Sequence, residues 1–482
     1  MATQVSLELA SPSLAHTRPN SLATGLLFLL SDAAALMVAA LVGFQLWALV
    51  NPSVPALHRQ FWPALVLFLI AYSLEGLYPG IGMNPVEQLR RCVQGTSIVY
   101  LILTTAIFLQ KDVGAHSRGV FISCWVLSVA LVPFLRAMVC HLFSARSWFG
   151  APVLLLGAGK TAQLLIKEFR SRRALGLRPM ACLDDDPSKL GECEGVPVLG
   201  PTSMAGEIGR SLRIRYVIVA MPGLHRAHLV PLIERMSSLF PYVIVIPDLF
   251  GVPSLWVAPT DLGGVLGLHI RHNLLIPFNR WLKRVMDLTV ACAGLIAAAP
   301  VIALSALLIK RVSPGRAFYC QEREGLGGRT IRVLKLRTMY PDAEKLLSAY
   351  LERHPEARQQ WERYCKLKND PRILPIIGPL LRRTSLDELP QLWNVLKGEM
   401  SLVGPRPFPR YHTAKFAPEF CALRRRVKPG LTGLWQISAR SDGDIDVQTA
   451  LDTYYIRNWS LWLDLYILSR TARAVLFGNG AY

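Results

Sequence analysis

Two adjacent carboxylates and two guanidinium groups share one short segment, Arg382-Arg383-Thr384-Ser385-Leu386-Asp387-Glu388-Leu389-Pro390. Further cations occur on either side of it, in Lys335-Leu336-Arg337 and in Pro405-Arg406-Pro407. Neighbouring negative charges repel each other, so they need cations or a metal ion nearby, and these segments supply such cations. An apolar stretch, Leu288 to Ile309, lies upstream and contains Pro300. Together these features predict a site that handles a pyrophosphate beside a lipid surface.

Helix capping is the alternative explanation of the acidic segment. Ser385-Leu386-Asp387-Glu388 fits the S-x-x-E capping box. In that register Pro390 would lie inside the helix, where it removes a hydrogen bond, so the helix starts later or the turn is bent. Capping therefore does not account for the whole segment. In the catalytic interpretation an aspartate attacks phosphorus and forms an acyl phosphate, while Mg²⁺ and cationic side chains neutralise charge.

The cations near this segment are candidate phosphate ligands. Lys335 and Arg337 alternate on a predicted strand, which places them on one face. Prolines on both sides of Arg406 restrict its backbone and lower the entropy cost of aiming its guanidinium, which can take two phosphate oxygens at once. The run Arg424-Arg425-Arg426-Val427-Lys428 predicts either binding of anionic headgroups or a solvated, phosphate-bridging face.

The N-terminal part of the chain predicts membrane spans. The chain has 482 residues, 52% of them hydrophobic, and a formal net charge of +20. A chain of this length needs several domains, and the apolar segments favour lipid and phosphate over nucleic acid as partners. We predict four spans, the third of them short: Leu22–Val50, Phe61–Tyr78, Thr96–Leu109 and Val120–Phe143. The basic region after Phe143 predicts that both ends of this bundle face the cytoplasm. Asp32, inside the first span, is expected to take a helix-packing or interface position.

A Rossmann-like α/β module is predicted next. Short apolar runs alternate with helical segments, which is typical of a parallel sheet. The predicted strands are Val153–Leu156, Met180–Leu183, Val196–Leu199, Tyr216–Ala220 and Tyr242–Ile246. Gly157, Gly159 and Ala162 match G-x-G-x-x-A, which can bring a helix N-terminus close to a phosphate. The alternative is a sheet that binds nothing or serves regulation and assembly.

The apolar stretch before the acidic segment is predicted to be a re-entrant membrane helix spanning 282–310. Pro300 must kink the helix. Crossing would carry one of the two basic flanks to the far side, whereas a hairpin keeps both at the cytoplasmic headgroups. These flanking cations are Arg280, Lys283, Arg284, Lys310 and Arg311. A Pro-kinked fifth span is the alternative. Tyr454, Tyr455, Trp459 and Trp462 predict a helix in the membrane interface, although a buried core helix would have a similar pattern.

At these residues the C-terminal region, about 278–482, resembles the large monotopic phosphoglycosyl transferases, also called the bacterial sugar transferase family. The matching segments are Lys283-Arg284-Val285-Met286-Asp287, Pro300, Gln321 to Gly327, Lys335 to Met339, Ser385 to Leu392, Gly398 to Pro407 and Lys428 to Gly433. Ala299, Leu336 and Thr338 depart from the forms common in that family, and none of these departures changes a charged group.

The resemblance implies a ping-pong transfer of hexose-1-phosphate, most closely galactose-1-phosphate, from a UDP-sugar to undecaprenyl phosphate. Asp387 would be the nucleophile and would bind Mg²⁺ or Mn²⁺, while Glu388 would activate the lipid phosphate or order the site. The phosphate ligands would be Lys335, Arg337, Arg382 and Arg406. The product would enter O-antigen or other polysaccharide synthesis at the bacterial inner membrane, with the catalytic domain facing the cytoplasm.

The resulting fold class is a multidomain membrane protein whose parts have distinct folds. The predicted parts are an N-terminal segment 1–20 that is disordered or mobile, a four-helix transmembrane bundle 21–145, a Rossmann-like α/β module 146–265 and a mostly α monotopic catalytic domain 266–482. The expected partners are a UDP-hexose, undecaprenyl phosphate and the lipid bilayer. The sequence leaves a homodimer open and predicts no nucleic-acid partner.

Three other functions compete with this one. The first is a non-enzymatic scaffold or regulator of polysaccharide chain length, which predicts that Asp387→Asn leaves polymer output unchanged. The same reaction with UDP-glucose would use the same residues. A membrane-anchored, NAD-dependent sugar-nucleotide dehydratase or epimerase would use Gly157, Gly159 and Ala162, with a Tyr-x-x-x-Lys pair beside them. One such pair, Tyr364 and Lys368, lies outside the module in a charged segment, so we expect that NAD is not needed.

Overall fold

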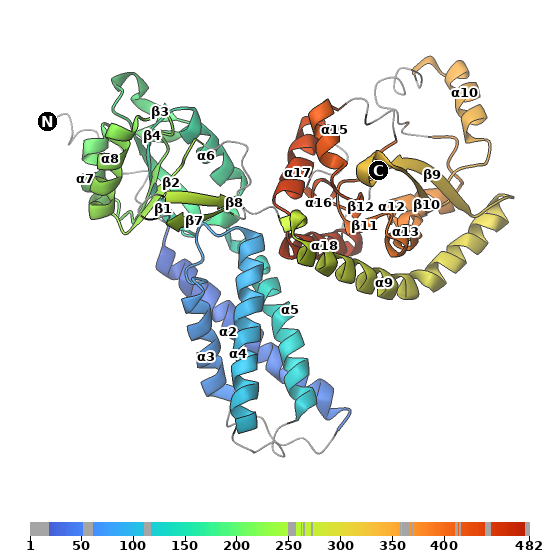
Figure 1. Cartoon of the computed structure of the whole chain (residues 1–482), viewed down its shortest axis with the longest axis horizontal. Helices are drawn as coiled ribbons and strands as arrows, with labels where there is room; N and C mark the ends of the chain where they lie inside the picture. The colour runs from blue at the N-terminus through green and yellow to red at the C-terminus, as the bar shows by residue number, and fades with distance from the viewer. Residues whose placement is uncertain are drawn as a thin grey trace. The chain divides into compact units, whose positions relative to one another are not determined.

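The computed structural model divides the chain into two compact units, Met1–Phe250 and Gly251–Tyr482 (Figure 1). The residues that it describes are 19–51, 61–109, 117–248, 257–261, 263, 266–270, 273–356, 358, 367, 370–409, 413, 416–438 and 445–477. Most of the N-terminal segment that was predicted to be disordered or mobile, residues 1–18, lies outside the described residues.

The first unit begins with four apolar helices, as predicted. They are α2 (Ser21–Ala48), α3 (Phe61–Leu74), α4 (Pro85–Leu109) and α5 (Arg118–Phe143). Helices α2, α4 and α5 are long and apolar enough to cross a membrane, and Ala64–Leu74 of α3 forms a shorter apolar segment. Asn20 begins α2, because its side-chain oxygen accepts hydrogen bonds from the backbone N–H groups of Leu22 and Ala23.

Helix α4 is longer than the predicted third span, which began at Thr96. It starts at Pro85, and its first turns are polar. Arg90 and Arg91 both form ion pairs with Glu87, one turn earlier on the same helix. Such pairs support a helix where hydrophobicity gives no signal, so apolar content alone placed the start too late.

Asp32 is buried within the bundle, in a helix-packing position. Its carboxylate accepts hydrogen bonds from Arg136 on α5, at 2.8 Å to Nε and 2.5 Å to Nη2, and from the Tyr78 hydroxyl at 2.6 Å. Both Asp32 and Arg136 are at most 1% exposed. The pair therefore joins the first and fourth helices in the middle of an apolar environment.

A six-stranded sheet follows the bundle in the same unit, with strand order β3-β4-β2-β1-β5-β6. The strands are β1 (Ala151–Leu156), β2 (Leu177–Leu183), β3 (Gly191–Cys193), β4 (Val196–Val198), β5 (Tyr216–Val219) and β6 (Tyr242–Val245). All neighbouring strands pair in parallel except β3 and β4. The predicted strands are confirmed, and β3 is an additional edge strand.

Helices cover both faces of this sheet (Figure 1). Helix α6 (Lys160–Ser171) packs on the face that carries Val153 and Leu155 of β1. Helices α7 (Ala205–Ser211) and α8 (Arg226–Leu239) pack on the face that carries Leu154 and Leu156. Because side chains alternate along a strand, the continuous apolar run of β1 serves both faces.

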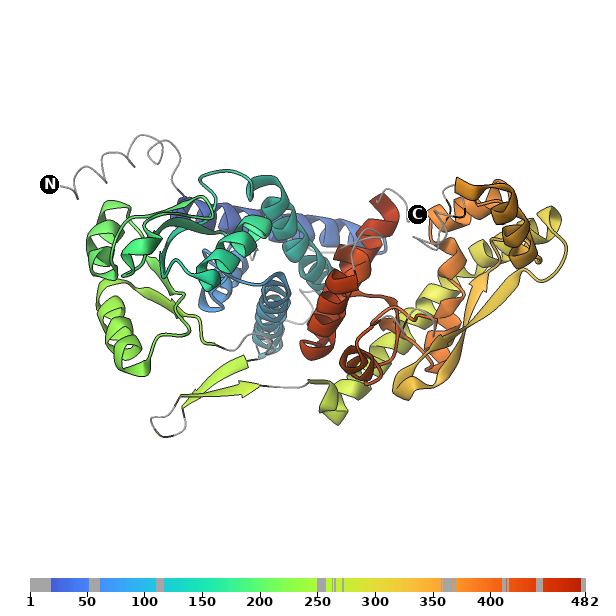
Figure 2. The same ribbon diagram turned by 90° about the horizontal axis from the view of Figure 1, so that it is seen from above.

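The second unit is built around one long helix, α9 (Pro277–Val312), preceded by the two-stranded ribbon β7 (Val257–Asp261) and β8 (Leu266–Ile270) (Figure 2). Figure 1 shows α9 as a continuous arc. It contains Pro300 and is a candidate membrane span. It is longer than the predicted 282–310, and the re-entrant path stays a prediction.

The remaining elements of this unit are mostly helical. They are β9 (Phe318–Glu324), β10 (Thr330–Leu336), α10 (Ala343–Arg353), α12 (Ile377–Arg383), η8 (Leu386–Glu388), α13 (Gln391–Lys397), β11 (Ser401–Val403), α15 (Pro418–Arg424), β12 (Gly430–Thr432), α16 (Leu434–Ser438), α17 (Ile445–Arg457) and α18 (Leu461–Phe477). Strands β9 and β10 form an antiparallel hairpin, and β11 pairs in parallel with β12.

The first half of α9 is tied to the unit's core by charged side chains. Lys283 lies 2.6 Å from the buried carboxylate of Asp464 on α18, to which Trp459 Nε1 and the Tyr455 hydroxyl also donate. Arg284 donates to the last carbonyls of α13. Two of the cations predicted at lipid headgroups are thus internal. Tyr455 and Trp459, each 2% exposed, belong to the core rather than to a membrane interface.

Candidate active site

Four of the predicted site residues converge at the end of the β9–β10 hairpin. Lys335 comes from β10, Asp387 and Glu388 from η8, and Arg406 from the loop after β11. Lys335 Nζ lies 2.7 Å from Glu388 Oε1 and 4.0 Å from Asp387 Oδ2. Arg406 Nη2 lies 2.8 Å from the same Glu388 oxygen. One carboxylate therefore holds two cations closely, while its neighbour is held more loosely.

The local backbone explains why the two carboxylates stand together. Asp387 and Glu388 lie in a single turn of 3₁₀ helix, entered through Ser385 in the left-handed region at φ +57°. No cap from the Ser385 side chain is formed, so the capping box is not present. The α-helix α13 starts only at Gln391, after Pro390, as the position of the proline required. Both side chains are thus presented before the helix begins.

Asn394, which the sequence analysis missed, links α13 to the strand that carries Lys335. Its side chain accepts from the backbone N–H of Leu334 at 3.0 Å and donates to the carbonyl of Arg332 at 2.7 Å. Asn394 is 2% exposed. A side-chain amide can both donate and accept a hydrogen bond. These two bonds fix α13 against β10, the strand that carries Lys335. A polar residue between the apolar neighbours Trp393 and Val395 was the available signal.

The two carboxyl groups have different proton affinities. Burial alone would raise the pKa of Glu388, but the charges of Arg406 and Lys335 outweigh it and lower the pKa to about 2. Burial raises the pKa of Asp387 above its ordinary value, and the Lys335 charge opposes this only in part. Glu388 is therefore a permanent anion, whereas Asp387 is the more basic oxygen donor of the two.

The other two predicted phosphate ligands lie in different surroundings. Arg382, on α12, donates from Nε to the hydroxyl of Thr338 at 3.0 Å. Desolvation lowers its pKa, and the charge of Asp387 opposes this, so the two side chains share one electrostatic environment. Arg337 lies beyond the end of β10, is 8% exposed, and donates to the carbonyls of Ser313 and Pro314. The structure does not bring Arg337 to the carboxylates. Its guanidinium instead bonds to the backbone that follows α9.

Glycines allow the Arg406 loop to approach the chain after α15. A Cβ on Gly430 would lie 2.1 Å from the nitrogen of Gly404, and one on Gly404 would lie 2.6 Å from the carbonyl of Lys428. Residues larger than glycine would separate β11 from β12 at these positions.

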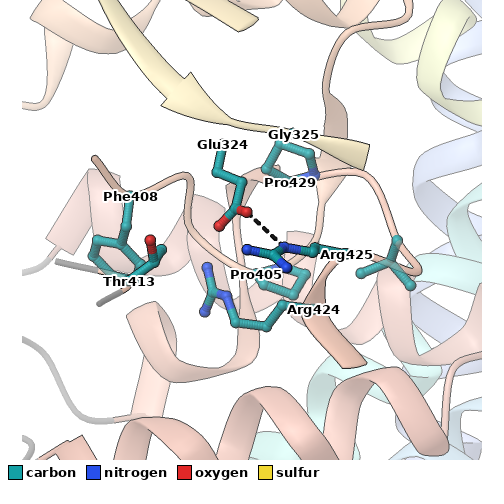
Figure 3. Close-up of a pocket in the computed structure, with 9 residues that line it drawn as sticks. Glu324, Gly325, Pro405, Phe408, Thr413, Arg424, Arg425 and Pro429 are labelled. Carbon is teal, nitrogen blue, oxygen red and sulfur yellow. Dashed lines mark hydrogen bonds and ion pairs between the residues drawn. The ribbon is translucent and has the colours of Figure 1, made fainter. Parts of the chain in front are cut away.

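Behind this loop lies a small cavity of about 20 Å³ (Figure 3). The nine residues that line it are Glu324, Gly325, Pro405, Phe408, Thr413, Arg424, Arg425, Val427 and Pro429. Figure 3 shows the Arg425 guanidinium directed to Glu324, at 2.6 Å. The cavity adjoins the backbone of the Arg406 loop and does not include the two carboxylates.

In the first unit the predicted glycine loop forms a strand-to-helix turn. Gly157 has φ +100° and follows β1, Gly159 caps α6, and Ala162 is buried on its first turn. Asp184, at the end of β2, accepts the Ala158 N–H at 2.7 Å and forms an ion pair with Lys189 at 3.1 Å. The Tyr364 and Lys368 pair lies outside the described residues.

The donor set near Asp387 suits a hard divalent cation shared with a substrate. Among the described residues there is no group of three or more His, Cys, Asp or Glu side chains that could hold a metal ion. Mg²⁺ commonly takes one or two carboxylates and completes its shell with substrate phosphates and water. Asp387 can supply such an oxygen, whereas the close oxygen of Glu388 is already shared by Lys335 and Arg406.

Comparison with known proteins extends over most of the chain. Residues 278–478 match the family described as bacterial sugar transferase, and residues 73–247 match one described as CoA-binding domain. The undecaprenyl-phosphate galactose phosphotransferase of Salmonella typhimurium is 35% identical over 393 residues, which are 80% of this chain and 81% of that protein. The UDP-galactose-lipid carrier transferase of Erwinia amylovora is 36% identical over 372 residues, 76% of each chain. A UDP-glucose:undecaprenyl-phosphate glucose-1-phosphate transferase of Escherichia coli is 32% identical over 338 residues, 68% of each chain.

Proposed function

Because the chain belongs to the bacterial sugar transferase family, we propose that it transfers hexose-1-phosphate from a UDP-sugar to undecaprenyl phosphate. The relatives named above carry out hexose-phosphate transfers of this kind, according to their names, and the chain covers most of their length. The observation that carries the proposal is the pair Asp387 and Glu388, adjacent in sequence but held differently by Lys335 and Arg406.

The unequal pair supports a two-step mechanism. In the first step an Asp387 carboxylate oxygen attacks the β-phosphorus of the UDP-sugar, the bond from that phosphorus to the bridging oxygen breaks, and UMP leaves. In the second step an oxygen of undecaprenyl phosphate attacks the same phosphorus and releases the carboxylate. The raised pKa of Asp387 favours it as the nucleophile, because the more basic oxygen is the better electron donor.

The cations have the complementary role of neutralising charge. Glu388 keeps Lys335 and Arg406 in place before substrate arrives, so little reorganisation is needed when a pyrophosphate enters. Arg382, which is electrostatically coupled to Asp387, is proposed to take a further phosphate oxygen. Mg²⁺ or Mn²⁺, held by Asp387 and the substrate, would supply additional charge neutralisation.

We propose galactose as the sugar and glucose as the alternative. Two of the named relatives are galactose enzymes by name, and the third is a glucose enzyme. We further propose that the product enters polysaccharide synthesis at the bacterial inner membrane, with the second unit on the cytoplasmic side. The exposed Arg280 before the apolar stretch of α9, with Lys310 and Arg311 after it, supports a re-entrant path for that helix.

The test is UMP release by the full-length protein in detergent, with polyprenyl phosphate, Mg²⁺ and a panel of UDP-sugars. We expect release with UDP-galactose and loss of at least about a thousandfold in Asp387→Asn, since the nucleophile is removed. Asp446→Asn is the matched control, because Asp446 is an exposed aspartate on α17. Intact-mass measurement of quenched reactions should show a hexose-phosphate adduct on the wild type and on Asp446→Asn, but not on Asp387→Asn. Absence of UMP release with every UDP-hexose would refute the transferase, and release that persists in Asp387→Asn would refute the nucleophile.

A further inference from the structure

The loop that carries Arg406 is positioned through its carbonyl groups. Arg406 lies between Pro405 and Pro407, neither of which has a backbone N–H to donate. The carbonyl of Pro405 accepts the Gly430 N–H at 2.9 Å. The carbonyl of Arg406 itself accepts a hydrogen bond from Nη2 of Arg424 at 2.5 Å. One of the two bonds therefore comes from a side chain, and a substitution can remove it without altering the backbone.

The side chain of Arg424 is itself held in place by an ion pair and by aromatic rings. It ends α15, and its other terminal nitrogen, Nη1, forms an ion pair with Asp452 on α17, a residue that is 2% exposed. Its guanidinium carbon lies 5.1 Å from the ring centre of Phe408 and 5.6 Å from those of Phe416 and Phe420. Figure 3 shows the side chain pointing toward the loop. A guanidinium that is enclosed by aromatic faces and bonded at both ends has little freedom to move.

We propose that Arg424 is a positioning residue for Arg406. It holds the Arg406 carbonyl so that the Arg406 guanidinium stays on Glu388, beside the proposed nucleophile. The proposal rests on the proposed function of Arg406, and it assigns Arg424 an internal role in place of headgroup binding. The neighbouring Arg425 differs, because its side chain is half exposed and pairs with Glu324 on the β9–β10 hairpin.

A double-mutant cycle tests whether Arg424 acts through Arg406. Arg424→Met, Arg406→Met and the double variant are compared with the wild type by the rate of UMP release. A displacement of about 1 Å can reduce a rate by about a hundredfold, so Arg424→Met should lose between about tenfold and a hundredfold. In the Arg406→Met background the same change should lose less than about twofold, since the group that it positions is already absent. Arg425→Met, the matched control, should lose less than about twofold in both backgrounds.

Hydrogen exchange of the 401–409 segment gives a measurement that does not depend on activity. Arg424→Met should accelerate exchange of the amides in this segment, and Arg425→Met should not. If the wild type releases no UMP, the transferase proposal fails, whereas the exchange comparison still decides whether Arg424 holds the loop. If Arg424→Met does not fold, Asp452→Asn can be used instead, because it removes the charge that orients Arg424. It should lower the rate of UMP release and accelerate exchange of the 401–409 amides, both by less than Arg424→Met would.

Chemical rescue distinguishes a lost contact from a general loss of structure. Guanidinium ion added to Arg424→Ala should restore at least about a tenth of the lost activity, and it should not restore the double variant Arg424→Ala/Arg406→Met. Losses by Arg424→Met and Arg406→Met that multiply, or unchanged exchange in the 401–409 segment, would overturn the proposal.

Discussion

Lys283→Met should destabilise the second unit, because Lys283 is an internal ion-pair partner. Its ammonium lies 2.6 Å from Asp464 Oδ2 and donates to the carbonyl of Val403 at 3.1 Å. Asp464 is 0% exposed and cannot turn toward water. The substitution leaves its carboxylate without the cation, although Trp459 and Tyr455 still donate to it.

The size of the expected stability loss follows from the burial of the Asp464 carboxylate, which Lys283→Met leaves without its cation. Removal of one partner from a buried ion pair destabilises a protein by about 3 to 5 kcal/mol. Burial already raises the pKa of Asp464. Without Lys283 the group can take up a proton, which limits the loss to about 3 kcal/mol. For a domain of about 150 to 250 residues, each kcal/mol lowers the unfolding midpoint by about 2 to 4 °C, so the midpoint should fall by about 6 to 12 °C.

The assay is the temperature at which half of the UMP-release activity is lost after brief heating in detergent. Lys310→Met is the matched control, because Lys310 is an exposed cation at the opposite end of α9, and it should shift this temperature by no more than about 2 °C. The double variant Lys283→Met/Asp464→Leu should recover at least half of the loss, since an apolar pair can replace a buried ion pair. If Lys283→Met resembles Lys310→Met, Lys283 is not an internal ion-pair partner and the argument fails.

Three other variants test separate contacts. Asp387 must be ionised to attack; burial raises its pKa, and the charge of Lys335 lowers it in part. Lys335→Met should therefore raise this pKa and move the acid limb of the kcat/KM profile to higher pH; an unchanged limb would contradict the coupling. Asn394→Leu leaves two backbone groups of β10 without their side-chain partner, which should destabilise the second unit by about 1 to 3 kcal/mol, measured by the same heating assay. Asp32→Leu leaves Arg136 buried and unpaired, so the bundle should lose about 3 to 5 kcal/mol in unfolding titrations with sodium dodecyl sulfate, and Asp32→Leu/Arg136→Leu should recover part of it. No difference between these single and double bundle variants would show that the ion pair does not join the helices.

The elements with strong local patterns were predicted well. The strands of the sheet and the apolar helices follow from runs of apolar residues bounded by turn residues, and these are properties of neighbouring positions. Helix α4 was predicted too short because ion pairs, rather than apolar residues, support its start at Pro85. Pro390 predicted that the helix starts later or that the turn is bent, and α13 does start only at Gln391, because the effect of proline on a helix is local.

Residues whose partners lie far away in the chain could not be assigned from their own neighbourhood. Lys335 and Arg337 alternate in the sequence, but β10 ends between them, so only Lys335 reaches the carboxylates. Tyr455 and Trp459 have the composition of an interface helix, yet both donate to one buried carboxylate. Aromatic residues with a polar group satisfy either environment, and only the fold reveals which is present.

The sequence by itself determined the chemical groups that the site contains, since adjacent carboxylates and a proline-flanked arginine are covalent facts about the chain. Tertiary structure alone decided how they differ: Glu388 contacts both Lys335 and Arg406, Asp387 contacts neither closely, and Arg424 holds the loop from behind. The reason is physical. Charge interactions and burial depend on distances through space, and packing brings together residues that are separated by many positions in the chain.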